Sequence, residues 1–442
     1  MKVYKLQENS MSSVENIKNA FGFITDCSPK IVILPATMET TKHLEKIAMY
    51  LFNRDIDSAH KEITKLEFKF IDLVNELFTN EDIKHETIDS ILDYFRHIWN
   101  YVKDEFTSAN EHEILSQGEF ITNIIMSHYL KEQGIDYVQI NVFDFMRTGL
   151  NDEPDMDYIQ HNLQHIFQQY PDTHLFITQG GLYKNAYNEI HTFKSGGGNH
   201  TSLLIGSAIE ANEILIWTDL QNIYKCHSET VNDSTHIKHL SFEEAEQLIY
   251  FGAKELQSFC IAPVCTKNIP IRLLNSSEPT YGGILISNQQ DDEVIKAVAS
   301  KDAMMYVKFK SNNTLRSYLF ISKILTTFAK HQTPLRLLTS SNTDVSVAID
   351  TKDKLPNIVN DLKNYAQIFV ESQMSLVSVI GNLKWQYAGA GSKVIEALRK
   401  IPLRMISYGS NNSNLSIIVK TVDRNRALQS LNSIFLEPGH AK

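Results

Sequence analysis

The sequence has little cysteine and no long hydrophobic run. Its 442 residues include only 4 cysteines, which are too few and too scattered for a disulfide framework. Cys260 and Cys265 would suit a metal pair, but no second pair or nearby histidine follows them. We therefore expect buried small side chains there and no tightly bound metal. No apolar run approaches the ~20 residues that cross a membrane, and the start MKVYKLQENS lacks the apolar core of a signal peptide. These absences favour a cytoplasmic protein.

Basic charge is also scarce. Lysine and arginine number 42 against 52 acidic residues, which gives a formal net charge of −10. Nucleic acids and anionic membranes attract basic surfaces, so we expect neither as a partner. A hydrophobic content of 43% with 21% charged residues is ordinary for a globular protein. A chain of this length exceeds one hydrophobic core and predicts roughly two to four domains.

Strand and helix patterns alternate along residues 1–285. Residues 30–34 form a continuous apolar run, typical of a strand that is buried on both faces. Residues 40–107 have a helical composition throughout, and Ser12, Ser13, Val14 and Glu15 resemble a capping box at a helix start. Further strands are predicted at residues 3–6, 137–142, 174–178, 213–218, 259–261 and 270–274. This alternation predicts an α/β domain with a three-layer, mainly parallel sheet that binds ligands at the carboxyl ends of its strands.

After residue 285 the pattern changes, and a repeat of about 70 residues appears. The segment LRLL at residues 335–338 recurs as LRMI at 403–406, and VSV at 345–347 recurs as LSI at 415–417. Each copy follows the order strand, helix, strand, strand, helix, which predicts a ferredoxin-like βαββαβ module. The first strands are expected at residues 304–308 and 376–380, and the last helix of the first copy at residues 355–362. Such a pair is either a duplicated structural domain or a small-ligand sensor, and its sheet edges favour pairing with another copy. We expect domains at residues 1–285, 286–370 and 371–442.

Short motifs occur in a fixed order along nearly the whole chain. They include IWTDLQNIY at residues 216–224, SFEEA at 241–245, YFGAK at 250–254 and NIPIR at 268–272. SVENI at residues 13–17, YLKEQG at 129–134, DFMRT at 144–148 and TQG at 178–180 extend the series. Together with the C-terminal repeat, these motifs resemble the aspartokinases, which are amino-acid kinase family proteins with tandem ACT domains.

The resemblance implies an enzyme that uses Mg-ATP to phosphorylate L-aspartate to 4-phospho-L-aspartate in lysine, threonine and methionine biosynthesis. It also implies a homodimer whose ACT modules bind lysine or threonine. The implied residues are Lys5 and Asp219 for catalysis, Thr41 and Glu119 for aspartate, Thr218, Asp219, Tyr224 and Lys254 for the nucleotide, and Asp344 and Ser346 for the effector. From the residues alone, the alternative for Lys5 is a solvated strand-end lysine, and the alternative for Asp344 is a surface acid on an edge strand.

Several positions depart from the family pattern. The residues concerned are Gln7 and Glu8 in place of two glycines, Pro35 and Gly198 in place of serines, Ser195 and Glu229 in place of arginines, and Asn199 in place of an acid. Glycines let a backbone approach phosphate closely, and arginine forks onto carboxylate or phosphate. These losses predict impaired kinase activity, unless Lys194 or Lys225 compensates for the lost arginines. The alternative function is a catalytically inactive paralogue that senses amino acids or binds a partner. SGGGNHT at residues 195–201 is either a new anion nest or a turn capped by Thr201.

Overall fold

The computed structural model describes the chain except residues 104, 194–196, 219–236, 252–260, 276–281, 290–293, 313–314, 351, 385, 387–388 and 437–442. The chain forms two compact units. The first contains Met1–Leu220 and Ser258–Asn288, and the second contains Gln221–Gln257 and Gln289–Lys442. The domain limits expected at residues 285 and 370 stay predictions.

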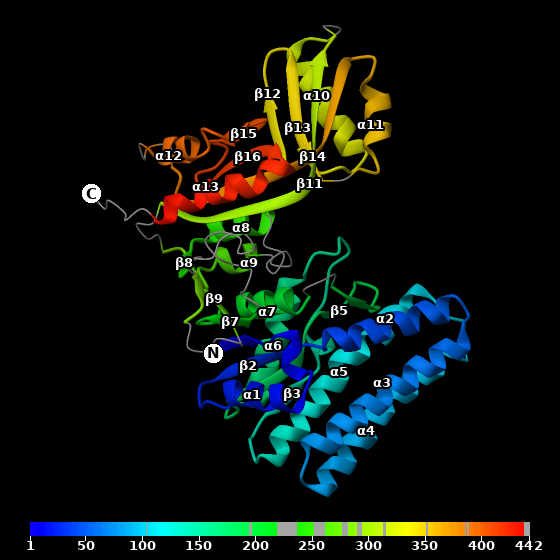
Figure 1. The fold of residues 1–442 in the computed structure, drawn as a ribbon. Helices are drawn as coiled ribbons and strands as arrows, with labels where there is room; N and C mark the ends of the chain where they lie inside the picture. Colours follow the sequence, from blue (N-terminus) through cyan, green and yellow to red (C-terminus); the bar gives the residue numbers. More distant parts are fainter. Residues whose placement is uncertain are drawn as a thin grey trace. The chain divides into compact units, whose positions relative to one another are not determined.

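A twisted sheet with mainly parallel strands forms the centre of the first unit (Figure 1). Its strands within this unit follow the order β3-β4-β2-β1-β7-β9-β10, and only β10 runs antiparallel to its neighbour β9. The bounds are β1 Lys2–Lys5, β2 Lys30–Leu34, β3 Val138–Ile140, β4 Leu175–Gln179, β7 Ile214–Trp217, β9 Ile271–Leu274 and β10 Ile284–Ile286. All residues of β2 are buried, as the apolar run predicted. The mainly parallel α/β sheet is thereby confirmed.

Helices cover both faces of this sheet. Tyr4 and Trp217 point into a core that α1 (Val14–Ile24) shares through Ile17. On the opposite face, α7 (Gly197–Ala208) approaches so closely that a Cβ on Gly206 would stand 2.3 Å from Ile214 Cδ1. The helix α6 (Met156–Gln169) packs on α7. The three layers follow because the central strands β1, β2, β4 and β7 are buried on both faces and must be covered twice.

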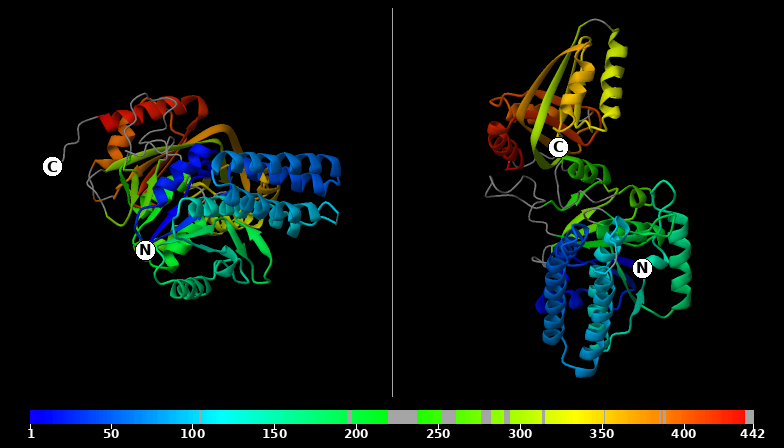
Figure 2. Two further views of the ribbon diagram at one scale, coloured as in Figure 1. Left: turned by 90° about the horizontal axis from the view of Figure 1, so that it is seen from below. Right: turned by 90° about the vertical axis from the view of Figure 1, so that its right-hand side faces the viewer.

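Four long helices form a bundle at one side of this unit (Figures 1 and 2). They are α2 (Met38–Phe52), α3 (Ile56–Leu77), α4 (Glu81–Asn100) and α5 (Ser108–Glu132), and each packs on two of the others. Buried residues recur at helical spacing, for example at Ile63, Leu66 and Phe70. The helical composition predicted for residues 40–107 is therefore correct as far as Asn100, with breaks where Asp55 and Asn80 cap new helices. It is wrong for the described residues of 101–107, which form turn and coil before α5.

The capping box predicted at Ser12 is wrong by one residue. The N-cap of α1 is Ser13, whose hydroxyl accepts a 3.3 Å hydrogen bond from the backbone N–H of Asn16. Ser12 instead closes the short 3₁₀ helix η1 (Glu8–Met11), because its N–H donates to the carbonyl of Asn9. The two serines therefore end one helix and begin the next.

One antiparallel six-stranded sheet organises the second unit, in the order β12-β13-β11-β14-β16-β15. Its strands are β11 Ile295–Ser311, β12 Leu337–Ser340, β13 Asp344–Ile349, β14 Ala366–Gly381, β15 Met405–Tyr408 and β16 Asn414–Lys420. The helices are α10 Ser317–Lys330 and α11 Leu355–Leu362 in one half, and α12 Ala390–Ala397 and α13 Arg424–Leu436 in the other. The repeat therefore gives two halves with separate hydrophobic cores on one shared sheet.

The two central strands join these halves. β11 and β14 are far longer than the strands predicted at residues 304–308 and 376–380, and they run through both halves (Figure 1). Both strands are irregular near their middle, where Ala303 and Gln373 adopt left-handed φ angles of 60° and 58°. Sequence periodicity detects the repeated halves but not the continuity of the strands between them.

The second unit also contains β8 (His239–Leu240) and α8 (Phe242–Phe251), which precede its main sheet in the sequence. The helix α8 packs on β11 and β14, and Glu244 forms a 3.0 Å ion pair with Lys296. The strand predicted at residues 259–261 lies outside the described residues except for Ile261, which is the N-cap of α9 (Ala262–Cys265). Across the described helices, none combines the length and apolar character of a membrane span.

Candidate active site

Lys5 ends β1 at the level of Ile33 on β2 and Ile216 on β7. Its side chain is only 7% exposed, and a Cβ built on Gly198 would lie 3.2 Å from Lys5 Cε. Burial lowers the pKa of the Lys5 ammonium from 10.5 to about 8, and the nearby Glu8 carboxylate opposes this shift. The alternative of a solvated strand-end lysine is therefore wrong, because this ammonium is enclosed.

Four glycines let two segments meet beside Lys5. Gly180 and Gly181 follow β4, whereas Gly197 and Gly198 begin α7. A Cβ on Gly180 would stand 2.6 Å from Ile33 Cγ2, and one on Gly197 would stand 2.7 Å from Gly181 Cα. The backbone of Gly181 is also left-handed, with a φ of 78°. Side chains at these positions would push the segments apart, so the close approach depends on glycine.

Thr201 fixes the approach from inside α7. Its hydroxyl accepts a 3.0 Å hydrogen bond from the backbone N–H of Gly181. Since α7 begins at Gly197, Thr201 is an interior residue of the helix and not its cap, and the predicted Thr201-capped turn is wrong. The helix therefore directs its N-terminal end, where backbone N–H groups favour anions, toward the glycine segment.

Glu119 on α5 completes the cluster. Its Oε1 would lie 3.8 Å from a Cβ on Gly181. Burial, with a smaller contribution from the negative charge of Glu8, raises the pKa of the Glu119 carboxyl to about 8. Lys5, Glu8 and Glu119 thus form one electrostatic cluster at the carboxyl ends of the parallel strands. The structure brings together Lys5 and Glu119, which the resemblance had assigned to phosphate and to the aspartate amino group.

Thr41 is engaged within its own helix. Its hydroxyl donates a 3.3 Å hydrogen bond to the carbonyl of Thr37, the N-cap of α2. The neighbouring Thr40 is buried, and its methyl group packs 3.2 Å from the Cβ position of Gly118, the residue before Glu119. The substrate role expected for Thr41 stays a prediction, and its hydroxyl would have to leave Thr37 to fulfil it.

Thr178 is a candidate site residue that the sequence reasoning missed. It lies on β4 at the level of Ile33 on β2, and Ile33 is in turn level with Lys5 on β1. Its hydroxyl oxygen is buried and has no hydrogen-bond partner in the described part of the chain. Buried polar groups are normally paired, so an unsatisfied hydroxyl in this row of strand ends is available to a ligand. The TQG motif contained the residue but gave no sign of this role.

The nucleotide side of the predicted site is described only at Thr218. Its backbone N–H donates a 2.9 Å hydrogen bond to the carbonyl of Leu274, which extends the pairing of β7 with β9. The other proposed nucleotide residues, Asp219, Tyr224 and Lys254, lie outside the described residues. So do two of the altered positions, Ser195 and Glu229, and the two lysines that could compensate for them, Lys194 and Lys225. Their roles stay predictions.

The expected effector residues lie on β13. Asp344 Oδ2 is 3.7 Å from Lys308 Nζ, whereas its Oδ1 is buried without a partner among the described residues. Ser346 Oγ shares a 2.8 Å hydrogen bond with the Tyr306 hydroxyl. Because β13 lies between β12 and β11, the alternative of an edge-strand surface acid at Asp344 is wrong.

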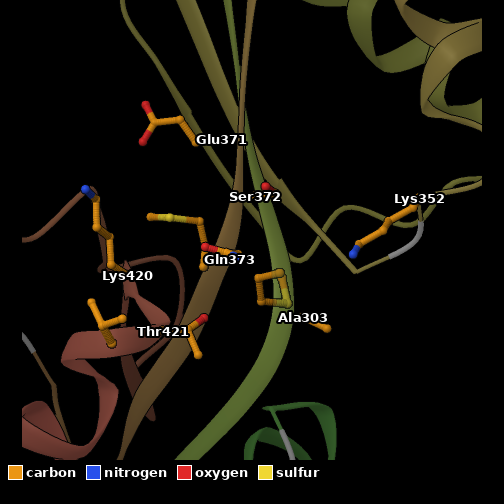
Figure 3. Close-up of a pocket in the computed structure, with 10 residues that line it drawn as sticks. Ala303, Lys352, Glu371, Ser372, Gln373, Lys420 and Thr421 are labelled. Atoms are coloured by element: carbon orange, nitrogen blue, oxygen red, sulfur yellow. The ribbon is translucent and has the colours of Figure 1, made fainter.

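A cavity of 660 Å³ lies elsewhere in the second unit, at the irregular centre of β11 and β14. Figure 3 shows Gln373 between Lys352 on one side and Lys420 on the other. Both lysines are exposed to solvent. Asp344 and Ser346 do not line this cavity. It is therefore separate from the expected effector residues.

Comparison with known families agrees with the fold. Residues 1–275 match the amino acid kinase family, and residues 377–435 match an ACT domain. The chain belongs to the amino acid kinase family.

Among individual proteins, the chain is 25% identical over 428 residues to lysine-sensitive aspartokinase 3 of Escherichia coli, and the match covers 94% of each chain. It is 23% identical over 460 residues to the chloroplastic aspartokinase 2 of Arabidopsis thaliana, covering 98% of this chain and 84% of that protein. The predicted resemblance to aspartokinases with ACT modules is thereby confirmed.

Solved structures share the fold. The E. coli aspartokinase III structure in complex with aspartate and ADP superimposes with a TM-score of 0.81 at 24% identity, covering 99% of this chain and 100% of that chain. Aspartate kinase of Clostridium acetobutylicum gives a TM-score of 0.79 at 22% identity, covering 98% and 99%. These likenesses confirm the α/β domain with an antiparallel C-terminal region.

Proposed function

We propose that this protein transfers the γ-phosphoryl group of Mg-ATP to the side-chain carboxylate of L-aspartate, which gives 4-phospho-L-aspartate and ADP. The observation that carries the proposal is the enclosed pairing of Lys5 with the Gly198 backbone, beside Glu119 and Gly181. The full-length similarity to aspartokinases supports the choice of substrate.

Each residue of the cluster has a task in this reaction. An oxygen of the substrate carboxylate attacks the γ-phosphorus, and the bond to the ADP oxygen breaks. Phosphoryl transfer needs positioning and charge neutralisation, which the Lys5 ammonium and the N-terminal end of α7 provide. Because the pKa of Lys5 is about 8, its ammonium is mostly protonated at neutral pH.

Glu119 is proposed to hold the amino group of aspartate. With a pKa of about 8, its carboxyl is mostly neutral in the empty site at pH 7. An arriving ammonium group stabilises the carboxylate and lowers that pKa, so substrate binding releases a proton. The site thereby binds the ammonium more tightly as the pH rises toward 8.

We also infer that turnover is slower than the family pattern would allow. Glu8 places a carboxylate within the electrostatic reach of both Lys5 and Glu119, where the resemblance expects a glycine. A carboxylate here competes with the phosphates of ATP for the Lys5 ammonium. A misplaced charge of this kind costs on the order of 2–4 kcal/mol of transition-state stabilisation. ATP is still expected to bind, through the proposed nucleotide contacts of Thr218, Asp219, Tyr224 and Lys254.

Amino-acid sensing without catalysis is the second candidate function. The observation in its favour is Asp344 Oδ1, which is buried and has no partner among the residues described. An ammonium group of lysine or threonine would satisfy this oxygen, with Ser346 close by on the same strand. Under this proposal the second unit binds the effector and pairs with another copy of the chain in a homodimer.

One experiment separates the two functions. The full chain is incubated with Mg-ATP and aspartate, and aspartyl phosphate is trapped as a hydroxamate. Lys5→Met should abolish the product, whereas Lys18→Met, an exposed change on α1, should not. No product from the wild-type chain, together with a melting shift on adding lysine or threonine, would replace the kinase proposal by the sensor. A ligand at ~100 Kd adds roughly 2.7 kcal/mol of stability, which a melt detects.

A further inference from the structure

A small pocket at the edge of the first unit is separate from the Lys5 cluster. It has a volume of 210 Å³ and lies between η2 (Val142–Asp144), the start of α6 and the hairpin of β5 (Leu182–Lys184) and β6 (Ile190–Thr192). Its lining residues are Phe143, Met146, Arg147, Tyr158, Lys184 and Asn188. Both charged members of this lining are cations.

The backbone sets Arg147 and Lys184 side by side. These two residues form an isolated parallel β-bridge. The N–H of Lys184 donates to the carbonyl of Met146 at 3.1 Å, and the N–H of Thr148 donates to the carbonyl of Lys184 at 2.9 Å. Directly bridged residues send their side chains to the same side, so both cations reach the same pocket. The juxtaposition is a property of the fold and not of two flexible surface chains.

Aromatic rings hold both cations without neutralising them. The Arg147 guanidinium carbon lies 5.4 Å from the centre of the Tyr158 ring, and Lys184 Nζ lies 5.6 Å from the centre of the Phe143 ring. A cation over a ring face is attracted by the ring quadrupole, but the net charge remains. Neither side chain forms an ion pair within the described ranges. Both side chains are also partly buried.

We propose that this pocket binds an oxyanion group, either a phosphate or a carboxylate carried by a small metabolite. The Arg147 guanidinium presents a fork of N–H donors that matches two oxygens, and Lys184 adds a point charge beside it. The Tyr158 hydroxyl and the Asn188 amide are further donors in the lining. Two cations without a counter-charge in 210 Å³ favour an anion over any neutral ligand.

The bound anion would restrain the hairpin that leads to the glycine segment. Phe193 follows β6, and its ring lies 4.4 Å from that of Tyr183 on β5. Its N–H donates a 2.8 Å hydrogen bond to the carbonyl of Gly181. An oxyanion that ties Lys184 to Arg147 therefore stiffens a segment attached directly to the Lys5 cluster. Binding itself does not depend on the proposed kinase reaction.

Calorimetry on the full chain tests the site with inorganic phosphate as the probe, at an ionic strength held constant with chloride. The Lys5→Met variant serves as the background, so that the kinase cluster lacks the ammonium group that would attract the probe. We expect phosphate to bind, and Arg147→Gln or Lys184→Met to weaken it by about tenfold or more. Lys184→Met keeps the aliphatic stem on Phe143 and so preserves packing. Arg147→Lys keeps the charge without the fork and should give an intermediate loss.

A parallel titration with malonate distinguishes the sources of the oxyanion. Binding of malonate in competition with phosphate assigns the site to carboxylates as well, and binding of phosphate alone assigns it to phosphates. The exposed Arg96→Gln is the matched control and should leave both titrations unchanged. No binding of either probe, or binding that persists in both Arg147→Gln and Lys184→Met, would overturn the proposal.

Discussion

Lys5 and Gly198 lie against each other, since a Cβ on Gly198 would stand only 3.2 Å from Lys5 Cε. The resemblance to aspartokinases implies a serine at this position. Its replacement by glycine gives the lysine stem room to lie along the start of α7. The same enclosure removes water from the ammonium and lowers its pKa to about 8. The buried ammonium that the proposed reaction needs therefore lowers the stability of the fold.

Replacing Lys5 by Met should abolish aspartyl phosphate formation and stabilise the fold. The pKa of this ammonium falls from 10.5 in the unfolded chain to about 8 in the fold, a penalty of about 3 kcal/mol. At pH 7 both states are protonated and the penalty is complete. It is relieved as the pH rises above 8, because the folded state then loses its proton first.

Urea unfolding of the wild-type and Lys5→Met chains, at pH 7 and at pH 9.5 or so, checks this expectation. The stability gain should be larger at the lower pH. The exposed Lys18→Met should change neither activity nor stability. A Lys5→Met variant that is less stable than the wild type would contradict the enclosed ammonium.

Replacing Glu8 by Gln should accelerate turnover. The Glu8 carboxylate raises the pKa values of both Lys5 and Glu119. Removing the charge frees the Lys5 ammonium for phosphate, and we expect a rise in kcat of about tenfold or more. Steady-state kinetics measure the change, with the exposed Glu15→Gln on α1 as the matched control. Unchanged or slower turnover would show that Glu8 does not oppose the phosphates.

The pH dependence of kcat/KM should be bell-shaped with its maximum near pH 8. The rising limb reports ionisation of Glu119, and the falling limb reports loss of the Lys5 proton; both groups have a pKa of about 8. Glu8→Gln should move both limbs to lower pH, because it removes a charge that raises both pKa values. A profile that is flat between about pH 7 and 9 would exclude these two groups from the reaction.

The sequence predicted those elements whose pattern is local. The buried run at residues 30–34 is β2, and residues 355–362 are α11, because each has a periodicity that its own residues determine. The bundle geometry of α2 to α5 depends on contacts between helices that no local pattern encodes. The continuity of β11 and β14 through both halves of the second sheet was missed for the same reason.

For the site, the resemblance led to Lys5 and Glu119, which do lie in one cluster. Motif spacing did not reveal Thr178, whose role depends on the alignment of β4 with β2. It also did not reveal that Glu8 acts on both groups, since that requires the enclosed geometry around η1. The pairing of distant strands and the electrostatic effects between distant residues cannot be predicted from a single sequence.

Removing the charge of Glu244 should strongly destabilise the second unit. Glu244 and Lys296 form an ion pair with side chains only 4% and 2% exposed. Truncating one member of a buried pair leaves the other charge inadequately compensated and costs about 3–5 kcal/mol. Glu244→Gln should therefore lower the melting temperature. The double variant Glu244→Leu with Lys296→Met should recover much of the loss.

The exposed pair of Arg399 and Glu396 is the control for that experiment, and Glu396→Gln should leave the melt unchanged. Differential scanning calorimetry measures both melting temperatures. Equal effects of Glu244→Gln and Glu396→Gln would contradict the importance of burial.

Adding a methyl group at Gly180 should damage both stability and catalysis. A Cβ there would stand 2.6 Å from Ile33 Cγ2 and 3.0 Å from Gly198 Cα, so the strand end and the start of α7 would have to separate. Overpacking of this kind costs about 1–3 kcal/mol, and the separation moves Gly198 away from Lys5. Gly22→Ala on α1 is the matched control, because nothing lies within 4 Å of its Cβ position apart from its chain neighbours and its own helix backbone. Alanine is the better helix former, so this control should gain about 0.5–1 kcal/mol. Denaturant unfolding and the hydroxamate assay on both variants measure the contrast, and a Gly180→Ala chain that keeps wild-type turnover would show that the glycine contact does not position Lys5.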